Sequence, residues 1–260
     1  TLSLHDALPI CQTDHGAQCR VRRQRRYNQA RTHDDCSSCC HLRLPTFNRL
    51  GDVEQQALLE ESIESFLRQT YRHKRLIILN DNPSQDAVFQ HELVKVVNTG
   101  KRFESLGDKH NALFAMADSD YICMWDDDDI SLPFRLEFLV DKLGDADYYN
   151  PRRQWYLPGG LEGKLVHNHS HGVCFNSSIV KRQALRLIGM APPTAASDME
   201  MDGALVSHGG VIKATTPKPL NPSQWSYIYR WGISRNHVSG KGNIDVNYRE
   251  NALHYVPHGS

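Results

Sequence analysis

The chain has 260 residues, of which 40% are hydrophobic and 23% charged, which fits one large globular domain or two small ones. Its 30 basic residues balance 30 acidic ones, so the net charge gives no indication of a nucleic-acid partner. No apolar run approaches the roughly 20 residues of a membrane-spanning helix. We expect a cytoplasmic chain with no nucleic acid bound and no transmembrane segment, while peripheral membrane contact stays open.

The first part of the chain differs from the rest. Residues 1–38 are rich in arginine and cysteine and show neither the period of a strand nor that of a helix. The opening string TLSLHDALPI resembles translated adapter DNA, so we interpret residues 1–38 as a disordered or artefactual segment. A basic RNA-binding tail is one alternative. A small zinc site is another, with ligands drawn from His33, Cys36, Cys39 and Cys40 or His41.

Regular patterning begins at residue 39. We expect a short strand from Cys40 to Leu44 that stops at Pro45, because proline lacks the N–H group that a central strand needs. The apolar stripe of residues 53–70 predicts an amphipathic helix. The apolar run at 76–79 predicts a buried parallel strand that ends in a polar turn.

The alternation of strand and helix then continues along the chain. It predicts a helix at 84–92, a strand at 93–97, a helix at 107–117 and a strand at 121–125. Such alternation indicates an α/β fold with a mainly parallel sheet, whose ligands bind beyond the carboxyl ends of the strands. Polar clusters follow three of the predicted strands, at 45–49, 80–82 and 126–129. We therefore expect the functional site where these clusters meet.

The strongest single signal is the acid run, Asp126 to Asp129, which lies between an apolar strand and a helix expected to start near Ser131 and Pro133. Adjacent carboxylates repel one another, and burying them is costly without protonation, hydrogen bonds or a cation. Mg²⁺ and Mn²⁺ prefer oxygen ligands and typically combine one or two carboxylates with substrate phosphates. The run therefore predicts a divalent metal site. A solvated acidic turn that caps the next helix is the alternative.

Four segments in order resemble the successive motifs of family 2 glycosyltransferases. They are PTFNR at 45–49, LIILND at 76–81, the stretch 105–129 that ends in the acid run, and ASDMEMDG at 196–203. The resemblance covers about residues 39–240. It implies the GT-A fold, a Rossmann-like, mainly parallel twisted sheet flanked by helices.

The resemblance also implies a domain organisation. A single GT-A domain would span residues 39–260. Its first half, 39–130, would bind the nucleotide sugar, and its second half, 131–260, would bind the acceptor.

Particular residues receive roles from the same resemblance. The donor would contact Pro45, Thr46, Asn48, Arg49, Asp81, Lys109, Asn111, Asp126, Asp127 and Trp231, with Lys109 and Asn111 near the diphosphate. The Asp-x-Asp metal motif aligns with Asp126 and Asp128, and His237 is a further candidate ligand. Because four acids stand in a row, the register stays open, and Asp127 and Asp129 can exchange roles with their neighbours.

The catalytic base implied by the resemblance is Asp198, which would take the proton of the acceptor hydroxyl, with Glu200 and Asp202 as substitutes. The implied reaction is the metal-dependent transfer, with inversion, of a sugar from a UDP-linked donor to a saccharide or other hydroxyl acceptor, using Mn²⁺ or Mg²⁺. Two alternatives remain. One is a metal-dependent nucleotidyltransferase, and the other is a catalytically inactive module that binds a sugar nucleotide.

The middle of the chain carries weaker signals. His167, His169 and His171 alternate as on one face of a strand, which fits histidines at a hairpin edge beside the acceptor or, alternatively, a metal site. After them we expect a strand at Cys174 and Phe175 and a helix from Ser178.

Overall fold

The computed structural model of the chain describes residues 40–46, 53–158, 166–168, 175–189, 191–193, 197–215 and 219–231. For some of these, including His167 and Trp231, only the backbone is described. The predictions made for residues 1–38 and for Asn48, Arg49, His169, His171, Cys174 and His237 lie outside the described residues.

A seven-stranded sheet, sheet A, forms the centre of the fold, with the strand order β10-β6-β9-β4-β1-β2-β3. Its strands are β1 (Cys40–Thr46), β2 (Lys74–Asn80), β3 (Val94–Asn98), β4 (Tyr121–Met124), β6 (Tyr148–Tyr149), β9 (Ile179–Lys181) and β10 (Ala214–Thr215). Strands β4, β1, β2 and β3 are parallel neighbours, and β10 is parallel to β6. Only β9 runs against its neighbours, β4 and β6. The predicted mainly parallel sheet is confirmed.

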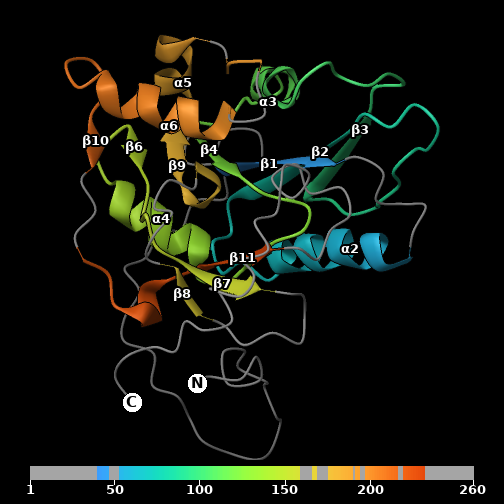
Figure 1. Ribbon diagram of the computed structural model, residues 1–260, viewed down its shortest axis with the longest axis horizontal. Coiled ribbons are helices and arrows are strands. Elements are labelled where there is room, and N and C mark those ends of the chain that lie inside the picture. Colours follow the sequence, from blue (N-terminus) through green and yellow to red (C-terminus); the bar gives the residue numbers. More distant parts are fainter. Residues whose placement is uncertain are drawn as a thin grey trace, which may run out of the picture.

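Helices cover both faces of sheet A (Figure 1). On one face lie α3 (Leu106–Ala115), α5 (Arg182–Ile188) and α6 (Ser197–Ser207), and on the other lie α2 (Val53–Leu67) and α4 (Arg135–Leu143). Two short 3-10 helices, η1 (Phe175–Ser177) and η2 (Pro222–Gln224), complete the described helical elements. The layered α/β architecture is the one that the alternating sequence pattern indicates.

A second sheet, sheet B, lies beyond α2 and α4 (Figure 1) and was not anticipated from the sequence. Its order is β5-β11-β7-β8, formed by β5 (Ile130–Ser131), β11 (Tyr227–Trp231), β7 (Gln154–Pro158) and β8 (Val166–Asn168). Strand β11 pairs antiparallel with β5, and Tyr227 lies opposite Ser131. The acid run ends where β5 begins, so this pairing brings β11 beside the run from about a hundred residues further along the chain.

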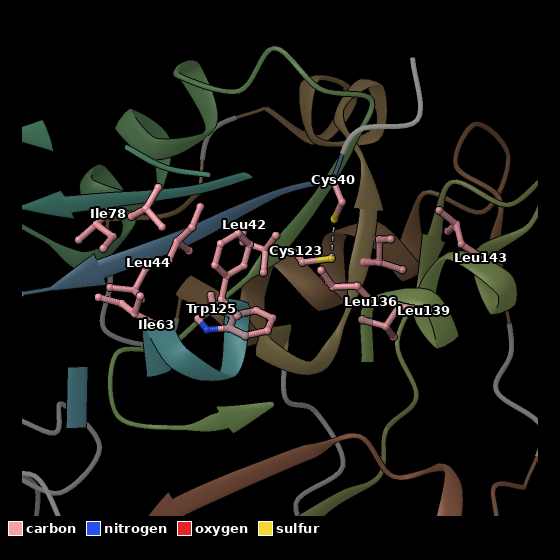
Figure 2. Close-up of a cluster of buried hydrophobic side chains, with 14 of the residues drawn as sticks. Cys40, Leu42, Leu44, Ile63, Ile78, Cys123, Trp125, Leu136, Leu139 and Leu143 are labelled. Carbon is pink, nitrogen blue, oxygen red and sulfur yellow. Dashed lines mark hydrogen bonds between the residues drawn. The ribbon is translucent and has the colours of Figure 1, made fainter. Parts of the chain in front are cut away.

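The main core lies between sheet A and the helices α2 and α4. Figure 2 shows Leu42, Leu44 and Ile78 of the sheet meeting Ile63 of α2 and Leu136 of α4, together with Trp125. The thiols of Cys40 and Cys123 also lie in this core, with their sulfur atoms 3.3 Å apart. Alternate residues of the same strands face the other side, where Ile122 and Met124 pack against Met201 and Leu205 of α6.

One predicted helix is wrong. Residues 84–92 form turns and irregular backbone, because side-chain amides take the place of helical partners for this segment. Asn98 accepts a hydrogen bond from the Ala87 amide at 2.9 Å and donates to the Ala87 carbonyl at 3.1 Å, and Asn80 donates to the Gln85 carbonyl at 2.7 Å. These bonds tie the loop to the ends of β2 and β3.

Three predicted boundaries also change. Strand β1 continues through Pro45, because its pairing with β4 ends at Arg43 and beyond that residue β1 pairs with β2 alone. The helix after the acid run begins at Arg135, because Ile130 and Ser131 pair with β11. Phe175 lies in a 3-10 helix instead of a strand, and the following helix begins at Arg182 after β9.

Candidate active site

The carboxyl ends of the parallel strands meet at one edge of sheet A, as predicted. In the strand register, Thr46 of β1 lies opposite Asn80 of β2, and Asn80 lies opposite Asn98 of β3. On the other side of β1, the pairing places Arg43 opposite Met124, two residues before the acid run. This carboxyl edge of sheet A is where an open parallel sheet binds its ligands.

Lys109 of α3 joins the ends of β1 and β2. Its Nζ donates to the Thr46 carbonyl at 2.6 Å and to Asp81 Oδ1 at 2.5 Å, while Asp81 Oδ2 accepts from the Phe103 amide at 3.1 Å. Burial lowers the pKa of Lys109, and the hydrogen bond and charge of Asp81 oppose that shift. The buried Thr46 Oγ1 has no hydrogen-bond partner among the described residues. Two groups at this edge can therefore bind a polar ligand. They are the Thr46 hydroxyl and the Lys109 ammonium group, which has a third N–H beyond the two bonds given above.

The acid run is largely withdrawn from solvent. Asp126 is half-buried, and Asp127, Asp128 and Asp129 are only 8%, 5% and 2% exposed. Burial, followed by the charge of Asp128, raises the pKa of Asp126 to about 7. Burial, followed by the charges of Asp128 and Asp126, raises the pKa of Asp129 well above its usual range. When no cation is bound, burial therefore favours the protonated forms of Asp126 and Asp129.

Helix α2 and strand β11 both hold the run. The Ser62 hydroxyl of α2 donates to the backbone carbonyl of Asp126 at 2.5 Å, and the backbone carbonyl of Ser62 accepts from Trp125 Nε1 at 3.0 Å. Tyr227 of β11 places its hydroxyl 2.8 Å from Asp126 Oδ2 and 2.5 Å from Asp129 Oδ2. A phenol has one hydrogen, so two full hydrogen bonds from this hydroxyl to the two carboxyls require a proton on one of them.

Two fully buried arginines support the run. Arg230 of β11 donates its backbone N–H to Asp129 Oδ1 at 2.7 Å, and its guanidinium contacts the Asp128 carbonyl and Glu61 of α2. Arg135 of α4 bonds to Ser131 Oγ at 2.6 Å, and no ion pair joins it to a described carboxylate. Arg230 thus contacts the run directly, whereas Arg135 bonds to the chain on either side of it, at Met124 and Ser131.

Asp198 lies in the first turn of α6, as predicted, and burial raises its pKa. The two substitutes occupy different surroundings. Glu200 is exposed, whereas the buried Asp202 accepts hydrogen bonds from Tyr148 at 2.5 Å and Asn150 at 2.9 Å and pairs with Arg152 at 3.0 Å. Asp202 is therefore engaged in fixing α6 to the end of β6, while Asp198 stands nearer the start of the helix.

Helix α3 also fixes the start of α6. Asn111 donates to the Ala191 carbonyl at 3.0 Å and accepts from the Ala191 amide at 2.6 Å, so both polar atoms of its side chain hold the segment before α6. His110 contacts Ser197 Oγ at 3.4 Å, and burial lowers the pKa of His110 to about 4, so this contact involves a neutral imidazole. The role of Asn111 at a diphosphate stays a prediction.

Gly107→Ala should disturb this docking between α3 and the segment before α6. A Cβ atom at Gly107 would lie 1.8 Å from the Pro192 carbonyl oxygen, and that backbone would have to move. Overpacking of this kind typically costs about 1–3 kcal/mol, so we expect a lower free energy of unfolding in urea denaturation. The matched control is Gly203→Ala on α6, where a Cβ meets nothing within 4 Å and should stabilise the helix. Equal effects of the two substitutions would contradict this account.

The other predicted residues have simpler outcomes. Pro45 lies opposite Leu79 near the end of β1, and Trp231 ends β11 opposite Pro158 of β7. His167 of β8 lies opposite Trp155 of β7. No three histidine, cysteine or acidic side chains within the described ranges form a preformed metal cage. In the same part of the chain, no helix is long and apolar enough to cross a membrane.

The sequence analysis missed residues that contact the run or bond to the chain on either side of it: Ser62, Asn176, Tyr227, Arg230 and Arg135. Three of them come from η1 and β11, far along the chain, and no spacing in the sequence links them to the run. Arg135 had a weak signal, since it follows the run closely as the Arg of ISLPFR.

Comparisons with known proteins agree with this geometry. The sequence profile of glycosyl transferase family 2 matches residues 43–202. Among solved structures, the chain is similar to S. aureus TarS 1-349 in complex with UDP-GlcNAc, with 13% identity and a TM-score of 0.52 over 77% of this chain and 60% of that one. The same TarS fragment in complex with UDP gives 12% identity and a TM-score of 0.50 over 74% and 60%. No curated protein matches the sequence.

These likenesses to solved structures concern the fold. This chain spans 60% of the length of the two TarS structures, and at 12% to 13% identity the match carries no information on individual residues. Together with the family profile, the match confirms the predicted GT-A fold.

Proposed function

Because the chain belongs to glycosyl transferase family 2, we propose that it transfers a sugar from a nucleoside-diphosphate donor to an acceptor hydroxyl, with inversion and with a divalent metal ion. The observation that carries the proposal is the acid run at the carboxyl edge of sheet A, buried and beside the cluster of Lys109, Asp81 and Thr46. Buried carboxylates with raised pKa values are costly without a cation, and a nucleotide diphosphate needs one.

The residues of the run fit a hard metal ion by their chemistry. Asp126 and Asp128 would supply carboxylate oxygens, and the absence of a complete cage among the described residues suits an ion whose remaining ligands are diphosphate oxygens and water. Mn²⁺ or Mg²⁺ bound there would offset the negative charge that develops on the leaving diphosphate. His237 remains a proposed further ligand.

The donor would lie along the carboxyl edge. Asp81 and Thr46, whose hydroxyl has no partner among the described residues, would face the nucleoside, together with Pro45, Asn48 and Arg49 of the same motif. Lys109, Asn111 and Asp127 would lie near the diphosphate, and Trp231 would contact the donor from the end of β11. TarS is described in complexes with UDP and with UDP-GlcNAc, which makes UDP-linked sugars the first donors to test.

The proposed reaction is a single displacement. The acceptor oxygen attacks the anomeric carbon, the bond from that carbon to the diphosphate breaks, and UDP leaves with the bonding electrons. Asp198 takes the proton of the acceptor hydroxyl, and its raised pKa suits a base that must hold this proton. The half of the chain that follows residue 130 would supply the acceptor contacts.

A donor assay tests the proposed function. Purified protein is incubated with UDP-linked sugars and Mn²⁺, and UDP release is measured with and without simple sugar acceptors. We expect metal-dependent release that EDTA abolishes and that an Asp126→Asn/Asp128→Asn variant lacks. Pyrophosphate release from nucleoside triphosphates in place of UDP release would favour a nucleotidyltransferase. Binding of donors without any turnover would favour an inactive sugar-nucleotide-binding module.

A further inference from the structure

The hydroxyl of Tyr227 lies between two carboxyls of the acid run. Its Oη is 2.8 Å from Asp126 Oδ2 and 2.5 Å from Asp129 Oδ2, and the side chain is buried on β11. Strand β11 belongs to sheet B, so the contact joins the second sheet to the end of β4 in the first. This hydroxyl contacts both Asp126 and Asp129, and the two carboxyls also form a side-chain hydrogen bond with each other.

Donors reach the two carboxyls unequally. Asp129 is 2% exposed, and protein donors use both of its oxygens, since Tyr227 bonds Oδ2 and the Arg230 amide bonds Oδ1 at 2.7 Å. On Asp126, Tyr227 and Asn176 Nδ2 both bond Oδ2. Asp129 therefore has the contacts and the burial of an anchor, whereas Asp126 is half-buried and more open to another partner.

The ring of Tyr227 is itself fixed in place. The Arg135 guanidinium carbon lies 4.7 Å from the centre of the Tyr227 ring and 4.9 Å from that of Trp125. Arg135 is fully buried and bonds to Ser131 Oγ and to the carbonyls of Met124 and Asn176. A cation that is desolvated and stacked on two rings holds them firmly, so the hydroxyl has little freedom to leave the run.

We propose that Tyr227 is a positioning residue of the metal site: it ties Asp126 to Asp129, so that Asp126 and Asp128 serve the metal ion while Asp129 serves as an internal anchor. The inference rests on the proposed function, because it assigns parts within the same site. It also narrows the register that the sequence left open, since Asp129 is then not a metal ligand. Partners that orient metal ligands typically change metal affinity by about 10–100-fold when removed.

The test is Mn²⁺ affinity, measured by isothermal titration in the presence of UDP. Tyr227→Phe removes the hydroxyl and keeps the ring over Arg135. We expect the Mn²⁺ affinity to fall by about 10–100-fold, with an altered electron paramagnetic resonance spectrum of the bound Mn²⁺. The matched control is Tyr149→Phe, because Tyr149 is also buried but packs against Phe138 of α4, away from the run. That variant should bind Mn²⁺ as the wild type does.

A second substitution tests the anchor role and keeps the inference falsifiable if Tyr227→Phe folds poorly. Asn at position 129 can accept from the Arg230 amide and donate to the Tyr227 hydroxyl, so Asp129→Asn should retain Mn²⁺ binding. Asp128→Asn should weaken it more than Tyr227→Phe does.

The outcomes separate the two proposals. Unchanged affinity in a folded Tyr227→Phe variant, or loss of binding in Asp129→Asn equal to that in Asp128→Asn, would overturn the positioning role and leave the proposed function intact. If the folded wild type binds neither Mn²⁺ nor UDP, the proposed function itself fails and the inference fails with it.

Discussion

Asp198→Ala should lower kcat by about 10²–10⁴-fold, the usual contribution of a general base, while donor binding stays unchanged. Asp198 lies in the first turn of α6, whose start is fixed to α3 by the contact between Ser197 and His110. Because burial raises the pKa of Asp198, the rise of kcat with pH in the wild type should lie above the usual carboxyl range. Steady-state kinetics across pH, with titration of UDP, measure both parts.

The control for this substitution is Glu200→Gln on the same helix. Glu200 is exposed and lies two residues from Asp198, so its neutralisation should leave kcat nearly unchanged. If Asp198→Ala retains wild-type kcat, or if Glu200→Gln loses as much, the base is another group. Asp202 is a poor choice of control because it bonds to Tyr148 and Asn150, and its loss would disturb the fold.

Lys109→Met should destabilise the protein by about 3–5 kcal/mol, as expected when one partner of a buried ion pair is removed. Lys109 and Asp81 have side chains only 7% and 5% exposed, and Asp81 would be left as an uncompensated buried charge. The Thr46 carbonyl would lose its donor as well, at the end of β1. Urea denaturation, monitored by circular dichroism, measures the change in the free energy of unfolding.

Two further variants separate stability from nucleotide binding at Lys109. Lys109→Met/Asp81→Asn removes the unpaired charge and should recover part of the stability but none of the UDP affinity. Lys142→Met, at an exposed pair with Asp141, should have little effect on either quantity. Wild-type stability in the Lys109→Met single variant would show that the pair does not hold the ends of β1 and β2 together.

Local sequence patterns predicted the four parallel strands β1 to β4 of sheet A but not β6, β9 and β10, and the predicted helix from Ser178 placed β9 in a helix. Apolar runs such as 76–79 and 121–125 form strands, because both faces of a parallel sheet are buried. The apolar stripe at 53–70 forms α2, because one face of that helix is buried. The helix expected at 84–92 failed because Asn80 and Asn98 satisfy that backbone, an effect that depends on the pairing of β2 with β3. No local window contains that information.

The candidate site was predictable only in part. The acid run follows β4, Asp81 follows β2, and Lys109 lies near the start of α3. Parallel pairing of the strands alone brings these residues to one edge of sheet A. Tyr227 and Arg230 reach the run through the pairing of β5 with β11, which joins residues about a hundred positions apart. The sequence of β11 shows only a short apolar and aromatic strand. Nothing in a single sequence indicates that this strand pairs with β5.

The most direct test of the account is isothermal titration of UDP into the folded chain, with and without Mn²⁺, beside the Asp126→Asn/Asp128→Asn variant. The account predicts that UDP binding depends on Mn²⁺ and that the variant loses this binding. The variant should nevertheless be at least as stable as the wild type, because the substitutions relieve charge repulsion within the acid run. Metal-independent UDP binding that is equal in both proteins would contradict the assignment of the acid run as the metal and diphosphate site.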